Sequence, residues 1–91
     1  MKVQLKVVAV LGQRVFKSGN GQDVVAVPML LEQGRDQFVA EAIGTAAMTL
    51  PENLGGGDYV WADLSFSAGS SERDGQKQYW QRVQISNVVR V

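Results

Sequence analysis

The C-terminal stretch Gly57–Val91 reads GDYVWADLSFSAGSSERDGQKQYWQRVQISNVVRV. Apolar and polar side chains alternate over Tyr59–Ala68 and again over Lys77–Val91, with the period of two that is typical of β-strands. The segment between them, Gly69–Gln76, is polar and glycine-containing. The stretch therefore predicts two long neighbouring strands that are joined by a polar hairpin tip.

Both predicted strands carry a tryptophan on the face that points away from the core. In the first strand the apolar face holds Val60, Ala62, Leu64 and Phe66, and the opposite face holds Tyr59, Trp61, Asp63 and Ser65. In the second strand Val83 and Ile85 set the inner face, which also carries Tyr79 and Gln81. The outer face of that strand holds Gln78, Trp80, Arg82, Gln84 and Ser86.

Three further strands are predicted earlier in the chain, at Lys2–Leu11, Gln22–Glu32 and Gln37–Gly44. Turns at Lys17–Gly21 and Gln33–Asp36 separate them, since Asn-Gly and Gly-Arg-Asp favour tight reversals. In the third of these strands we expect Val39 and Ile43 to point inward. Thr45–Leu54 is the one candidate helix, and Pro51 limits it to one or two turns.

This order of elements predicts an all-β protein, a five-stranded OB-fold Greek-key barrel with a short helical turn between strands 3 and 4. Residues 1–91 are expected to form a single OB-fold domain, because 91 residues with 45% hydrophobic content suffice for one modest core. Barrel closure also removes the free edges that such a valine-rich chain would otherwise expose.

The composition argues against several classes of function. The chain has no histidine and no cysteine, so it lacks the commonest general base, thiolate metal ligands and disulfides. No nucleophile–base pair stands out, so we expect no enzyme, no metal, no cofactor and no small-molecule substrate. No apolar run approaches the ~20 residues of a membrane span, and the absence of cysteine fits a cytoplasmic protein.

Charge is balanced overall, with nine Lys and Arg against nine Asp and Glu, but it is unevenly distributed. The first 22 residues hold four cations and no acid, and residues 23–63 hold seven acids and one cation. The C-terminal segment is again basic. If the two ends of the chain adjoin in the barrel, a neutral protein still presents a basic strip, with Lys2, Lys6, Arg73, Lys77 and Arg82 as its candidates. An ordinary solvated surface is the alternative.

Three short motifs carry a resemblance to a known family. Gly57–Leu64 (GDYVWADL) and Arg73–Tyr79 (RDGQKQY) resemble the strand-four hairpin of bacterial single-stranded-DNA-binding proteins. Asp23-Val24-Val25 is similar to the second strand of that family. The resemblance covers most of the chain, extends to the small bacterial and phage OB proteins, and implies the OB fold and binding of single-stranded DNA.

The chain departs from the family pattern in three places. Its predicted third strand carries one aromatic residue, Phe38, and an acid where the family has stacking aromatics. The hairpin tip has no aromatic residue, and the acidic proline-tipped tail that recruits partners in the family is missing. The recruitment of partners through such a tail is therefore not expected for this chain.

The sequence leads to two functional hypotheses. In the first, the protein binds single-stranded DNA with little sequence preference, as in DNA replication, and forms a homodimer or tetramer. Stacking on bases is assigned to Trp61, Trp80, Tyr59 and Phe38, and contact with phosphates to the five cations above. In the second, it is an assembly subunit of a replication, conjugation or phage complex, and the tryptophans pack at an interface or cover the core.

Overall fold

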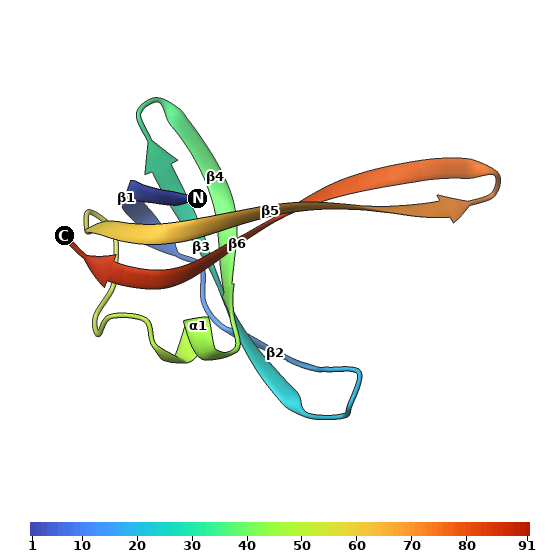
Figure 1. The fold of residues 1–91 in the computed structure, drawn as a ribbon, viewed down its shortest axis with the longest axis horizontal. Coiled ribbons are helices and arrows are strands. Elements are labelled where there is room, and N and C mark those ends of the chain that lie inside the picture. The colour runs from blue at the N-terminus through green and yellow to red at the C-terminus, as the bar shows by residue number, and fades with distance from the viewer.

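Six β-strands and one helical turn form the protein, seen here in a computed structural model that describes residues 1–91 (Figure 1). In chain order they are β1 (Lys2–Val10), β2 (Arg14–Lys17), β3 (Asp23–Gln33), β4 (Asp36–Ile43), α1 (Thr45–Met48), β5 (Tyr59–Arg73) and β6 (Gln76–Arg90). The sheet order is β1-β5-β6-β4-β3-β2, and β1 also pairs with β3. Five strands therefore close into a barrel, and β2 extends β3 outside it.

The barrel strands pair antiparallel except at the seam between β4 and β6. These two strands run parallel, and one pair of residues, Glu41 and Gln84, is in register. The β1–β5 and β3–β4 pairings extend over five and eight residue pairs. The prediction of a mostly-β barrel with a short helical turn is confirmed, and the parallel seam is its shortest junction.

The helical turn follows β4, whereas the sequence predicted it between the third and fourth strands in chain order. The difference arises from β2, a four-residue strand that was not predicted because Arg14–Lys17 is too short to show a period of two. It pairs with Asp23–Ala26 of β3 and so lengthens the first hairpin. The helical turn covers four residues, and no helix in the protein is long or apolar enough to cross a membrane.

Residues from all five barrel strands build the core. Its buried members are Leu5, Val7, Val27, Met29, Leu31, Ala40, Ala42, Val60, Ala62, Leu64, Ile85 and Val88. They alternate along the strands with exposed or half-buried residues, as a one-sided sheet requires. At about 25 cal/mol per Å² of buried apolar surface, these side chains are the main source of stability.

The expectation that Val39 and Ile43 point inward is wrong. Ala40 and Ala42 are fully buried on the opposite parity, and Val39 is 50% exposed. The register explains the choice, because Ala40 lies opposite Met29 and Ala42 opposite Val27, so that small and large side chains share the interior. The reverse orientation would also have buried the carboxylate of Glu41.

The β5/β6 hairpin continues past the barrel as an arm, which we define as Ser65–Arg82 (Figure 1). The expected polar loop at Gly69–Gln76 is instead mostly strand, and the reversal is a two-residue turn at Asp74 and Gly75 with φ of 53° and 76°. Such an Asp-Gly turn matches the twist of the two strands. The arm raises the radius of gyration to 14.5 Å, above the about 12 Å typical of a globular chain of this length.

The predicted inner face of the two long strands is only partly internal. Leu64 and Ile85 are buried, but Phe66 and Tyr79 on the same parity are 54% and 73% exposed. They are exposed because the arm has left the barrel at this point and no strand lies opposite. The alternation of side chains persists, but the core ends at Leu64.

The loop before β5 is held against β1 and the end of β6. Gly57 N–H donates to the carbonyl of Val7, and Val7 N–H donates to the carbonyl of Asp58. The Asp58 carboxylate accepts the Gly55 N–H at 3.0 Å and lies 3.3 Å from the Arg90 guanidinium. The Gly55 N–H and then Arg90 hold the pKa of Asp58 below its ordinary value. This stabilisation is present above about pH 4 and is lost as the pH falls through the lowered pKa.

Gly56 has no room for a side chain, and its substitution tests this packing. A Cβ at Gly56 would lie 2.7 Å from the carbonyl oxygen of Val8, a backbone atom that cannot move without disturbing β1. We expect Gly56→Ala to lower the free energy of unfolding by about 1–3 kcal/mol in urea titrations. Gly55→Ala is the matched control, because a Cβ there meets nothing within 4 Å, and it should change stability by less than about 0.5 kcal/mol. Equal effects of the two variants would contradict this account.

Candidate nucleic-acid interface

Four of the predicted binding residues gather on the outer surface of β1 and β5. The register places Lys2 opposite Asp63, Gln4 opposite Trp61 and Lys6 opposite Tyr59. Directly opposed residues of an antiparallel pair project from the same face of the sheet. We call the surface formed by these six residues the barrel face. On it Tyr59 and Trp61 are 51% and 42% exposed, so two neighbouring aromatic rings on β5 lie beside a strand that carries a lysine on either side of Gln4.

A hollow of about 540 Å³ adjoins the barrel face and is lined by Lys2, Trp61, Asp63, Asn87 and Val89. Asn87 has a left-handed φ of 53° and sits at the irregularity where β5 and β6 lose register. Asn tolerates this conformation better than most residues. Its side-chain amide donates to Oδ2 of Asp63 at 2.9 Å, so the bulge brings an oriented carboxylate beside Trp61. Sequence reasoning missed both Asp63 and Asn87 as candidates, since nothing in the local pattern marks a bulge.

The other predicted tryptophan lies on the arm, opposite Gly69. The indole of Trp80 lies over the Gly69 backbone, because a Cβ at Gly69 would come within 2.6 Å of the ring. Gly69 is the one residue of the arm that is not exposed. Trp80 therefore covers the backbone of its cross-strand neighbour and still leaves 46% of its own surface accessible.

The cations of the arm are divided between its two faces. Arg82 and Arg73 share the pleat parity of Trp80, since Arg82 lies opposite Ser67 and Arg73 opposite Gln76. Lys77 lies on the other parity, with its Nζ 5.6 Å from the centre of the Tyr79 ring. A hollow of about 490 Å³ lies along the arm, with Phe66 and Tyr79 of this second face and Trp80 of the first face in its wall. Both faces of the arm thus combine an aromatic ring with positive charge.

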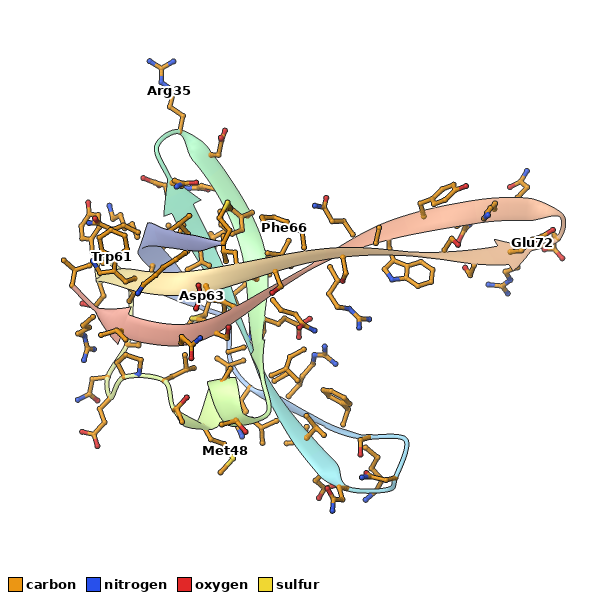
Figure 2. The ribbon with its side chains drawn as sticks, in the orientation of Figure 1. Arg35, Met48, Trp61, Asp63, Phe66 and Glu72 are labelled. Atoms are coloured by element: carbon orange, nitrogen blue, oxygen red, sulfur yellow. The ribbon has the colours of Figure 1, made fainter.

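The two tryptophans do not form one continuous platform. Both have the same pleat parity in the β5/β6 ribbon, but the two strands cross between the barrel and the arm (Figure 1). Trp61 and Gly69 are eight residues apart on β5, or about 26 Å along an extended strand. Figure 2 shows Trp61 on the barrel at one end of the molecule and Glu72 near the tip of the arm at the other. The single strip expected from the sequence is therefore two patches, the barrel face and the arm.

Phe38 lies apart from both patches. It is half-buried in β4 opposite Leu31 and packs against the core. The neighbouring outer surface of β4 carries Glu41, whose carboxylate is 2.6 Å from the Arg14 guanidinium. The stretch of β3 and β4 therefore offers neither a fully exposed ring nor free positive charge.

The five predicted phosphate contacts share one electrostatic property. Three of the nine cations, Arg14, Lys17 and Arg90, form ion pairs, at 2.6, 3.1 and 3.3 Å. The other six have no acid within 4 Å, and five of them are the candidates Lys2, Lys6, Arg73, Lys77 and Arg82. The three acids that form ion pairs, Asp23, Glu41 and Asp58, thus pair with other cations, and the candidate residues remain available to an external anion.

Comparison of the chain with models of known protein families and with curated proteins gives no match.

The contact between Trp80 and Gly69 can be tested by substitution of the glycine. Gly69→Ala places a Cβ in the space of the indole ring, so the ring must move away from the ribbon and become more exposed. In a Trp61→Phe background, where Trp80 is the single tryptophan, we expect red-shifted emission and faster quenching by iodide. Ser71→Ala, the next position on the same face of β5, is the matched control and should leave both signals unchanged. Identical spectra for the parent and Gly69→Ala would show that the ring does not rest on Gly69.

Proposed function

We propose that the protein is an OB-fold barrel that binds single-stranded DNA. The pairing of the closed barrel supports the OB assignment. If β2 is counted as an extension of the first hairpin, α1 lies between the third and fourth barrel strands, and the parallel β4–β6 seam completes a Greek-key closure. In OB folds the loops between barrel strands one and two and between four and five clasp the ligand. Here those positions are the β2/β3 hairpin and the arm.

The observation that carries the proposal is the pairing of exposed rings with unpaired cations on both patches. On the barrel face Tyr59 lies opposite Lys6, and Trp61 lies opposite Gln4, between Lys6 and Lys2. On the arm, Trp80 lies two residues from Arg82. Proteins that bind single strands combine stacking rings with a positively charged path for the backbone. The length of about 26 Å along β5 between Trp61 and Gly69, the neighbour of Trp80, suits an oligonucleotide rather than a single nucleotide, since one OB fold covers about 4–16 nucleotides.

The ligand path proposed here differs from the one suggested by the family resemblance. Because β3 and β4 lack free cations on their outer surface, we place the strand across β1 and β5 and along the arm. The β2/β3 hairpin contributes little charge, since Lys17 is paired with Asp23. A protein of zero net charge with a short footprint gains useful affinity through several copies in a row, so we propose that it acts as a homo-oligomer.

Tryptophan fluorescence provides the direct test. Titration with an oligothymidylate at low salt should quench the emission, and Trp61→Ala and Trp80→Ala should each weaken binding by about 1–3 kcal/mol, the worth of one stacked base. Met48→Ala is the matched control, because Met48 is a large apolar residue that is 80% exposed on α1, away from both patches. Unchanged affinity in both tryptophan variants, with intact folding, would remove the stacking role.

The unpaired cations make a separate prediction about salt. Each phosphate contact contributes about 0.7 to the slope of log affinity against log salt for a single strand. Lys6→Gln and Arg82→Gln should each lower that slope by about this amount. Arg35→Gln is the control, because Arg35 is also unpaired but lies at the end of the β3/β4 hairpin (Figure 2). If Lys6→Gln and Arg82→Gln give the same slope as Arg35→Gln, Lys6 and Arg82 do not contact phosphates.

A protein-assembly subunit is the second candidate, and one observation favours it. Phe66 and Tyr79 are more than half exposed beside the hollow of about 490 Å³, on the face of the arm that continues the core. Exposed apolar surface of this kind is typical of protein–protein contacts. The titration above separates the two functions, since an assembly subunit shows no quenching by oligothymidylate even at low salt.

A further inference from the structure

The hollow beside Trp61 has an apolar surface that is formed by two cross-strand neighbours. Trp61 on β5 and Val89 on β6 lie opposite each other in the register, and they are 42% and 60% exposed. The volume of about 540 Å³ falls within the range of about 300–1,000 Å³ typical of small-ligand sites. A nucleobase uses such a surface by stacking, and stacking alone does not distinguish one base from another.

The polar groups at the rim of the hollow can distinguish one base from another. Oδ2 of Asp63 accepts the amide of Asn87, and Oδ1 of the same carboxylate has no partner in the protein. Lys2, across from Asp63 on β1, forms no ion pair with it. The rim therefore offers one oriented hydrogen-bond acceptor and one free ammonium donor beside the stacking surface.

An ionised carboxylate only accepts hydrogen bonds, so it favours a base edge that presents N–H groups. Guanine presents two adjacent donors, the ring N1–H and the exocyclic amino group, and its O6 accepts from an ammonium. Thymine presents a single N–H between two carbonyl oxygens, which repel a carboxylate. We propose that this hollow is a base-selective subsite that takes guanine in preference to thymine. The proposal rests on the proposed binding of single-stranded DNA.

The test compares oligonucleotides that differ at one position. The probes are an oligothymidylate of about 12 nucleotides, within the footprint of one OB fold, and the same strand with one central guanine. A single guanine avoids quadruplex formation. For the unmodified protein we expect the guanine strand to bind at least about fivefold more tightly, the lower end of the discrimination that hydrogen bonds to a base edge provide. Asp63→Asn should bring this ratio close to one and leave the affinity for oligothymidylate equal or higher.

Glu72→Gln is the matched control, since it removes the same charge from β5 at the tip of the arm (Figure 2). It should leave the ratio unchanged. Asn87→Gly keeps the left-handed backbone but removes the amide that orients Asp63, and it should lower the ratio without unfolding the barrel.

A ratio near one in the unmodified protein, or the same ratio in Asp63→Asn, overturns the subsite and leaves strand binding standing. Failure of every strand to bind overturns both the subsite and the proposed function. The two failures are thus distinguishable in one set of titrations.

Discussion

The structure depends on one strand, β1, pairing with two partners at once. Lys2–Lys6 pair with β5, and Lys6–Val10 pair with β3, with an irregularity between Val7 and Ala9, just after the residue that pairs with both strands. Such a bulge bends the strand and increases its twist, which is what closing a small sheet requires. Without this double pairing the barrel would open along β1, and the core residues Leu5 and Val7 would lose one wall.

The same pairing fixes the candidate interface. Because Leu5 and Val7 point into the core, Lys2, Gln4 and Lys6 must point outward, and the β1–β5 register then sets them against Asp63, Trp61 and Tyr59. The rings are exposed at no cost to the core, since the inward positions of β5 are filled by valine, alanine and leucine. The bulge on β6 adds Asn87 to this surface, so a second local irregularity supplies the oriented carboxylate.

The arm is stabilised differently from the barrel. A two-stranded ribbon has marginal stability in water, and this one is held by the tight Asp74-Gly75 turn, by the continuous register with the barrel and by the indole of Trp80 over Gly69. Every residue of the arm except Gly69 is exposed. A ribbon that is wetted on both faces, with aromatic rings and unpaired cations, is suited to contact a ligand rather than to support the core.

The sequence alone determined the five barrel strands, the inward and outward parity of β1 and β5 within the barrel, and a mostly-β barrel, because alternation with a period of two is local and the hydrophobic pattern sets it. It also identified the exposed tryptophans and five of the six cations that the fold leaves unpaired. It missed β2 and the change of parity at the bulge of β6, after which Val88 is buried. It misplaced the inward face of β4, because both parities there are apolar apart from Glu41, and only the opposing Met29 and Val27 select Ala40 and Ala42. Tertiary structure alone decided where the barrel ends on β5 and β6, and hence that Phe66 and Tyr79 are exposed. It also decided that Trp61 and Trp80 lie on separate patches and that Asn87 meets Asp63, because these distances follow from pairing between segments far apart in the chain.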